Sequence, residues 1–274
     1  RLADAASVPL LAPMLVWLPV AIGLVATSWL VGPLGSAGAD LASERMLVAL
    51  VGLGTMTLAA LAALAQDDLG HATAYLAIAD AGLILVACGV DGPVVVPPLR
   101  TALLALLASK TGLVAWLVAT ESAYGTRRLP DLGGWARRSP LLGLAFSVVA
   151  IATVGWPGSP MLDARLDVVR FATGSAAPIA AIALFAALPA YARTLWIGLG
   201  RPFGAVAAAE TSRLRRPAAW AVGDGGRARE RLGALARDLT AVWALDRRPG
   251  AAAAVLLLAL LGVAITAGAW PTPA

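Results

Sequence analysis

Two ionisable side chains of opposite charge, Asp80 and Lys110, each lie inside a long apolar stretch of the sequence. A charge at that depth in a bilayer costs about 3 kcal/mol even on lenient insertion scales, and such residues usually line a path for protons or ions. Lys110 is the single lysine of the chain, and arginine supplies the rest of its 21 basic side chains. Because a buried ammonium can release its proton whereas a guanidinium remains charged, Lys110 is a candidate proton carrier.

The same two residues are also explained by a purely structural ion pair. Their apolar stretches are joined by a short loop, and their opposite charges at similar depth would neutralise one another. Both interpretations predict that the two side chains meet inside the bilayer. They differ in whether the pair exchanges protons with its surroundings, and the sequence leaves both open.

Further ionisable residues stand near the ends of apolar stretches. Asp163, Arg165 and Asp167 follow the helix-stopping residues 155–160, which contain two glycines and two prolines. The segment 161–174 is either half of a discontinuous helix buried among others, where these charges form an acid–base gate, or a short helix at the membrane interface. His71 lies at the mouth of a stretch, where contact with lipid headgroups is the simpler interpretation and proton entry is the alternative.

The elements that must position these residues are membrane-spanning helices. Of the 274 residues, 59% are hydrophobic and 14% are charged, and the mean hydropathy is +0.81, which excludes an ordinary water-soluble globule. The expected fold class is all-α, a polytopic transmembrane helical bundle with discontinuous helices and about seven or eight spans. The predicted helices are 8–31 (broken by three prolines), 46–65, 69–89, 99–120, 139–155, 161–174, 176–200 and 251–270.

The expected organisation has three regions: a transmembrane helical bundle (1–200), a basic extramembrane segment with an amphipathic helix (201–248) and a C-terminal transmembrane helix (249–274). The net charge of +5 and the isoelectric point near 10.3 do not indicate nucleic acid, because the arginines lie in loops where the positive-inside rule accounts for them. The chain opens at Arg1 without a signal-peptide pattern, and we expect it to be the C-terminal part of a longer protein.

No constellation typical of a soluble enzyme is present in the sequence. There is one histidine and one cysteine, and neither a glycine-rich phosphate loop nor a Ser-His-Asp set can be assembled. We therefore expect no catalytic residue, no metal site and no cofactor in this chain.

Five stretches, taken together and in this order, resemble the antiporter-like membrane subunits of complex I (NADH:quinone oxidoreductase) and of the related multisubunit cation/proton antiporters and membrane hydrogenases. Residues 68–82 resemble the family's D-[LIV]-K-R-x-[LI]-A-Y-S-S-I-x-H-x-G stretch, and residues 109–113 resemble the segment whose lysine lies mid-membrane. The other three are similar to D-L-x-G-L-x-R-R-x-P (131–140), G-I-P-P-x-x-G-F-x-x-K (155–165) and, at the start of the chain, D-A-x-x-A-P (4–9).

The resemblance covers nearly the whole chain and implies the second half of a fold built from two inverted repeats. Lys110 matches the family, whereas Gly70 stands in place of a lysine, Asp80 in place of a histidine, and Arg165 in place of a lysine or glutamate. The lysine of the first broken helix is replaced by Val20 or Ala21. These departures remove proton-exchanging groups, since arginine does not release its proton at physiological pH.

The resemblance implies an antiporter-like subunit that takes part in proton or cation translocation within a complex I-like or Mrp-like assembly, without a cofactor of its own. Its partners would be other membrane subunits, the bilayer and protons or monovalent cations, in a bacterial cytoplasmic membrane. The implied ion-translocation residues are Lys110, Asp80, Arg165, Asp163, Asp167 and His71. The alternative hypothesis is a divergent scaffold subunit that anchors partner subunits without moving ions. The two hypotheses differ in whether Lys110 and Asp80 face a hydrated interior.

Overall fold

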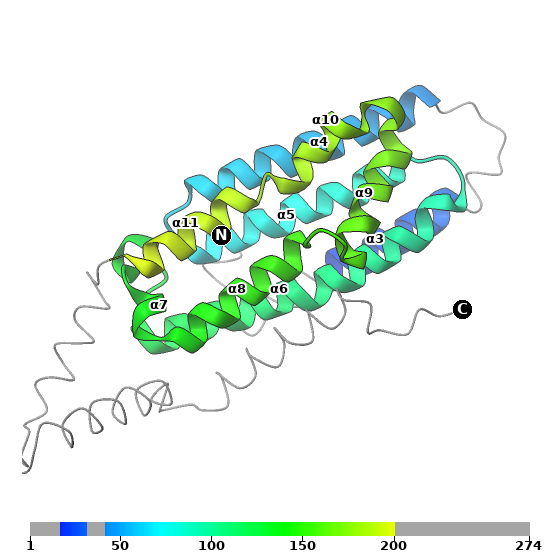
Figure 1. The fold of residues 1–274 in the computed structure, drawn as a ribbon. Coiled ribbons are helices and arrows are strands. Elements are labelled where there is room, and N and C mark those ends of the chain that lie inside the picture. Colours follow the sequence, from blue (N-terminus) through cyan, green and yellow to red (C-terminus); the bar gives the residue numbers. More distant parts are fainter. Residues whose placement is uncertain (1–16, 32–41, 201–274) are drawn as a thin grey trace, which may run out of the picture.

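The computed structural model describes residues 17–31 and 42–200, and these form helices and turns with one isolated bridge between Asp68 and Arg128. The predictions for residues 8–16, 201–248 and 251–270 lie outside the described residues. The α-helices are α3 (Leu18–Val31), α4 (Ala42–Ala65), α5 (Leu69–Cys88), α6 (Val96–Tyr124), α7 (Trp135–Arg138), α8 (Pro140–Val154), α9 (Pro160–Thr173), α10 (Ala177–Ala180) and α11 (Leu188–Leu199) (Figure 1). Four 3-10 turns join them: η3 (Pro93–Val95), η4 (Leu129–Leu132), η5 (Gly174–Ala176) and η6 (Ala181–Phe185).

Helices α4 and α5 form a hairpin whose backbones touch. A Cβ atom added to Gly82 would lie 2.7 Å from the carbonyl oxygen of Gly52, and one added to Gly52 would lie 2.7 Å from the Val86 nitrogen. Glycine on both helices therefore sets their separation, as small residues do where membrane helices cross closely. This crossing fixes the position of Asp80, which lies two residues before Gly82 on α5.

Helix α6 is the central element of the bundle and contacts α3, α5, α8 and α9. It begins at Val96, three residues earlier than predicted, because Pro97 and Pro98 occupy its first turn, where no backbone donor is needed. It ends at Gly125, whose φ of 71° lies in the left-handed region. Lys110 is the middle residue of this helix, roughly 21 Å along the axis from either end.

The chain turns sharply between α6 and α8. The segment Leu129–Arg138 meets Pro140–Val154 at 107°. The predicted helix 139–155 begins one residue before α8, whose first residue is Pro140, and Ser139 makes no side-chain hydrogen bond to the helix backbone. Its hydroxyl lies 2.7 Å from the hydroxyl of Tyr124 instead, so this serine ties α8 to the end of α6.

A five-residue turn, residues 155–159, separates α8 from α9. Gly155 and Gly158 have φ values of 85° and 81°, which other residues rarely adopt, and Ser159 caps α9 by accepting a hydrogen bond from the Leu162 nitrogen. Helix α9 then packs against α5, α6 and α8 with one face buried. Of the two interpretations of 161–174, this packing supports the discontinuous helix among other helices.

Beyond α9 the predicted span 176–200 is not a single helix. Its first residue belongs to η5, η6 interrupts it between α10 and α11, and Pro178 and Pro189 lie in the first turns of these two helices. Proline lacks the backbone donor that a continuous α-helix needs, which accounts for breaks at these points. The stretch η6–α11 lies alongside α4 (Figure 1).

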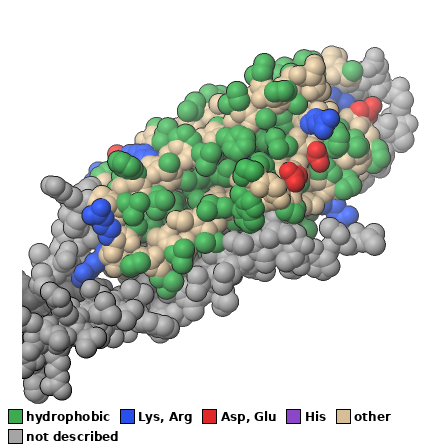
Figure 2. Space-filling view, in the orientation of Figure 1, with side chains coloured by type: hydrophobic (Ala, Val, Ile, Leu, Met, Phe, Trp, Pro, Cys, Tyr) green, Lys and Arg blue, Asp and Glu red, His purple; other side chains and the backbone are tan. Residues whose placement is uncertain are grey.

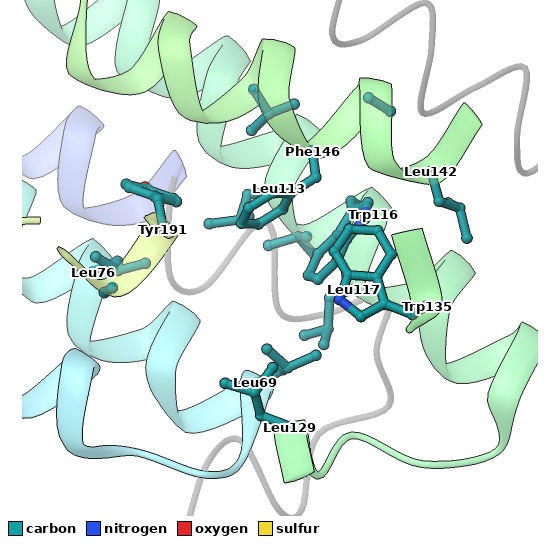
Figure 3. Close-up of a cluster of buried hydrophobic side chains, with 14 of the residues drawn as sticks. Leu69, Leu76, Leu113, Trp116, Leu117, Leu129, Trp135, Leu142, Phe146 and Tyr191 are labelled. Atoms are coloured by element: carbon teal, nitrogen blue, oxygen red, sulfur yellow. The ribbon is translucent and has the colours of Figure 1, made fainter. Parts of the chain in front are cut away.

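Among the described residues, four helical runs are long and apolar enough to cross a membrane: Ala42–Ala65, Leu69–Cys88, Pro93–Tyr124 and Pro160–Leu199; the bent pair around Pro140 adds a fifth if it is one span. Hydrophobic side chains cover most of the face in Figure 2, with few charged ones among them. Inside, one apolar cluster surrounds Trp116, Trp135 and Phe146 (Figure 3), and a second surrounds Leu83, Leu103 and Met161.

Candidate ion-translocation site

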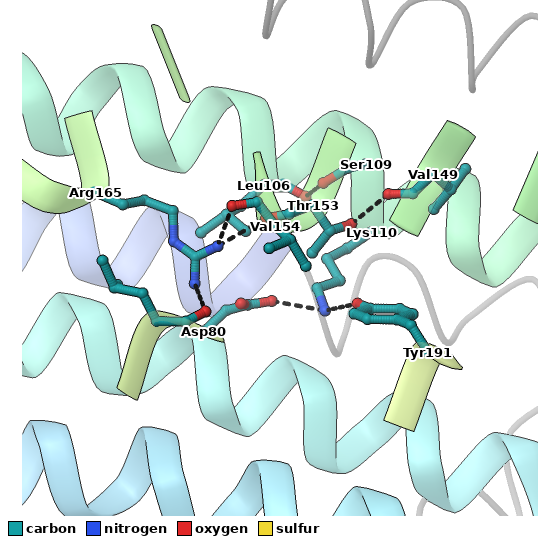
Figure 4. Close-up of polar contacts among 10 residues, drawn as sticks. Asp80, Leu106, Ser109, Lys110, Val149, Thr153, Val154, Arg165 and Tyr191 are labelled. Carbon is teal, nitrogen blue, oxygen red and sulfur yellow. Dashed lines mark hydrogen bonds and ion pairs between the residues drawn. The ribbon is translucent and has the colours of Figure 1, made fainter. Parts of the chain in front are cut away.

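Asp80 and Lys110 meet in the interior of the bundle, as the sequence predicts. Helix α5 contributes the carboxylate and α6 the ammonium, and Lys110 Nζ lies 2.9 Å from Asp80 Oδ2 (Figure 4). The Lys110 side chain is 3% exposed and that of Asp80 is 16% exposed. The pair is thus removed from solvent, and its Coulomb attraction is little screened.

Tyr191 of α11 completes the contacts of the ammonium. Lys110 Nζ donates a hydrogen bond of 2.8 Å to the Tyr191 hydroxyl, and the same nitrogen lies 5.5 Å from the centre of the tyrosine ring. Sequence analysis missed this residue, which stands 81 positions from its partner. The available signal was a lone phenol in an apolar span, because a buried tyrosine hydroxyl usually requires a hydrogen-bond partner.

Arg165 lies near the same cluster and closes the end of α8. Its Nη1 donates to the carbonyl oxygens of Thr153 at 2.8 Å and Val154 at 3.2 Å, and its Nη2 lies 3.5 Å from the Leu184 carbonyl oxygen. These carbonyls end a helix and have no partner within it, so the guanidinium satisfies them. Arg165 Nε has no hydrogen-bond partner among the described residues.

The site contains two buried cations and one carboxylate. Asp80 is near enough to Arg165 to act on its charge as well as on that of Lys110 (Figure 4). Within the described residues Asp80 forms its ion pair with Lys110 alone, and the permanently charged guanidinium of Arg165 attracts the carboxylate over a longer distance.

The structure does not bring the other predicted site residues into this cluster. On α9, Asp163 is exposed and Asp167 is half-buried, whereas Arg165 between them is buried, so the two aspartates face away from it. An acid–base gate among these three residues is not formed in the structure. His71 lies roughly 14 Å along α5 from Asp80, with its Nδ1 3.7 Å from Asp68 Oδ1 and its side chain 37% exposed.

Arg193 of α11 contacts the end of α4. Its Nη1 donates to the carbonyl oxygens of Leu64 at 2.7 Å and Gln66 at 2.6 Å, and its Nη2 lies 2.7 Å from Asp67 Oδ1. It therefore caps α4 and joins α11 to the α4–α5 turn. The neighbouring Trp196 is 80% exposed.

Within the described ranges, no group of three or more His, Cys, Asp or Glu side chains is placed to hold a metal ion. The polar groups that the structure does gather are an ammonium, a carboxylate, a phenol and a guanidinium. Such a set can hold and pass protons.

Comparison with known proteins agrees with this chemistry. The family model described as "NADH:quinone oxidoreductase/Mrp antiporter, TM" matches residues 2–188. The chain belongs to this family. Together with the apolar helical runs, membership confirms the expected fold class, an all-α membrane-embedded bundle, and the resemblance drawn from the sequence motifs.

Two curated relatives in this family are similar over part of their length. NADH-quinone oxidoreductase subunit N 2 of Syntrophobacter fumaroxidans is 34% identical over 111 residues, which is 40% of this chain and 24% of the relative. F(420)H(2) dehydrogenase subunit M of Methanosarcina mazei is 28% identical over 165 residues, 58% of this chain and 32% of the relative. The matched part is thus a third or less of either relative.

A solved structure gives the same fold. A chain of respiratory complex I from Thermus thermophilus with bound NADH superimposes with a TM-score of 0.52 at 18% identity, over 88% of this chain and 49% of that chain. At this identity the likeness concerns the fold alone.

Proposed function

We propose that this chain is an antiporter-like membrane subunit that moves protons or monovalent cations within a complex I-like or Mrp-like assembly. The observation that carries the proposal is Lys110, buried at the middle of α6 between a carboxylate and a phenol. Lys110 is the carrier, and Asp80 is its counter-ion. The names of the relatives, subunits of quinone- and F420-linked dehydrogenases, support this assignment.

A scaffold role explains the buried charges less well. A subunit that only holds its neighbours needs apolar and small residues on its helices, and removing a buried ion pair often stabilises such a protein. The bundle instead surrounds Lys110 with groups that can accept its proton, and Arg165 stands as a second counter-charge to Asp80. This arrangement suits a lysine that alternates between charged and neutral states.

The remaining roles follow as parts of the same proposal. Partner membrane subunits cover some of the exposed apolar surface, such as Met46, Leu50 and Leu58 of α4, and the assembly lies in a bacterial cytoplasmic membrane. The proposal also includes the segments outside the described residues, 201–248 as a basic extramembrane region and 249–274 as a further span. Asp163, Asp167 and His71, outside the buried cluster, bear on ion entry or exit rather than on the carrier step.

The proposal is tested by replacing Lys110 in the full-length protein within its complex. Lys110→Arg keeps the charge and chain length, so a structural role survives it, but guanidinium does not release its proton. We expect normal assembly, measured by copurification of the other subunits, and strongly reduced proton or cation movement into membrane vesicles. Lys110→Met should be similar or worse. Undiminished ion movement in an intact Lys110→Arg complex would overturn the carrier assignment and favour the scaffold.

A further inference from the structure

Two small cavities border the residues that contact the Lys110 ammonium. The first, lined by Asp80 and Lys110 together with Pro19 and Val20 of α3, has a volume of about 20 Å³. The second, also about 20 Å³, lies between α4, α5, α6 and α11 and is lined by Tyr191. A cavity that holds one water needs about 10–15 Å³, so each has room for a water molecule.

Polar groups in the second cavity suit water. Its polar lining residues are Gln66, Thr73, Trp116, Tyr191, Arg193 and Thr194. Trp116 is 1% exposed, and its Nε1 donor has no hydrogen-bond partner among the described residues. Thr73 and Thr194 donate their hydroxyl hydrogens to carbonyls one turn earlier, which leaves their oxygens free to accept. A buried donor without a partner costs about 1–3 kcal/mol, which a water in the cavity would relieve.

Tyr191 both contacts the ammonium and lines the second cavity. Its hydroxyl oxygen accepts a hydrogen bond from Lys110 Nζ, and the hydroxyl hydrogen remains to be donated. Lys110 is the only hydrogen-bond partner of this hydroxyl among the residues that the structure describes. The phenol side chain is 4% exposed, so the acceptor of its hydrogen lies inside the bundle.

We propose that Tyr191 is a proton relay that connects Lys110 to a water-filled cavity leading to the α4–α5 turn. This inference rests on the proposed function and adds the route by which the carrier lysine exchanges its proton on one side. Lys110 lines the first cavity itself, beside Asp80, and reaches the second cavity through the Tyr191 hydroxyl.

The relay step balances in protons and charge. The ammonium transfers one proton from Nζ to the phenol oxygen, and the phenol passes its original proton to the cavity water, so that Lys-NH3+, Tyr-OH and H2O become Lys-NH2, Tyr-OH and H3O+. The tyrosine ends as it began, and Asp80 retains Arg165 as a counter-charge. The excess proton then reaches the rim of the cavity at Gln66 and Arg193, beside the exposed carboxylate of Asp67.

The experiment replaces the phenol hydroxyl alone. Tyr191→Phe in the full-length protein and assembled complex should leave the copurifying subunits unchanged and lower proton movement into vesicles by about a hundredfold or more, the smaller end of what a positioned proton-transfer group contributes. The matched control is Tyr124→Phe, which removes a half-buried hydroxyl that lies on Ser139, away from Lys110, and should leave the rate unchanged.

A second readout separates a relay from a structural hydrogen bond. A ring-fluorinated tyrosine at position 191 keeps the hydroxyl and its contacts but makes the phenol a stronger acid. The pH dependence of proton movement should then shift to lower pH, whereas a purely structural hydroxyl would leave the profile unmoved.

The outcomes distinguish this inference from the proposed function. Full activity of Tyr191→Phe together with an inactive Lys110→Met would overturn the relay and leave Lys110 as the carrier. Full activity of both variants would overturn both. Reduced movement in Tyr191→Phe with an unshifted pH profile for the fluorinated protein would also count against the relay.

Discussion

Because Asp80 and Lys110 are coupled, replacing either one should lower the free energy of unfolding, but by unequal amounts. Asp80→Asn removes the one carboxylate of the cluster and leaves two buried cations, Lys110 and Arg165, without a counter-charge. Breaking a buried pair costs about 3–5 kcal/mol, and we expect this substitution at the upper end. Lys110→Met removes the ion-pair partner of Asp80 but leaves the longer-range attraction of Arg165, so we expect about 3 kcal/mol.

The double substitution should cost much less than the sum. With both members gone, Arg165 keeps its carbonyl partners and no carboxylate is left unpaired. We expect about 5 kcal/mol for the double variant, hence a coupling energy of about 3 kcal/mol.

The assay is denaturant unfolding of the purified complex in mixed micelles, combined with the folded yield of the four proteins of the cycle. Asp91→Asn serves as the control, because Asp91 pairs with Arg45 at the surface with an 84% exposed side chain and should contribute less than about 1 kcal/mol. Additive single effects, with a coupling energy near zero, would show that the two charges act independently and would refute the argument.

Two further substitutions test the elements that hold the site. Gly82→Leu should displace α5 from α4, because a Cβ there meets the Gly52 carbonyl at 2.7 Å; the folded yield should fall sharply, whereas Gly54→Ala, with nothing within 4 Å, should be tolerated. Equal yields would contradict the close crossing. Arg165→Met should leave the Thr153 and Val154 carbonyls unsatisfied and lower the unfolding free energy by about 3 kcal/mol, and Arg165→Lys should recover part of the loss. A loss below about 0.5 kcal/mol would show that this cap is dispensable.

The sequence predicts the parts of the fold that depend on one helix at a time. It places α5 to within a residue of its end and Lys110 at the middle of α6, because charge depth and apolar length are local properties. It also predicts the contact of Asp80 with Lys110, since only two opposite charges lay deep in adjacent spans. Position along a helix thus carries much of the information about this pair.

What the sequence does not predict depends on how distant segments pack. Tyr191 reaches Lys110 only because η5, α10 and η6 return α11 to the bundle, and the proline positions alone do not specify that path. From the sequence, Arg165 is predicted as one more ion-translocation residue. Its contacts with the end of α8 depend on the turn at Gly155, which the sequence alone does not specify. Asp163 and Arg165 lie on different faces of α9 because they are two residues apart in a helix, and this separation could be predicted once the segment was known to be helical.

The 3-10 turn η6 precedes α11, so the winding of η6 sets the position of α11 along its axis. Each residue rises about 2.0 Å in a 3-10 helix and about 1.5 Å in an α-helix, so converting the five residues Ala181–Phe185 would draw α11 along its axis by about 2.5 Å and rotate it by about 100°. Tyr191 lies six residues beyond η6, and a hydrogen bond of 2.8 Å does not survive such a screw movement. A change of winding at η6 would therefore disconnect the phenol from the ammonium without moving α5 or α6. The timing of proton release would then be set by α11, although the turn that moves it, η6, contains no charged residue.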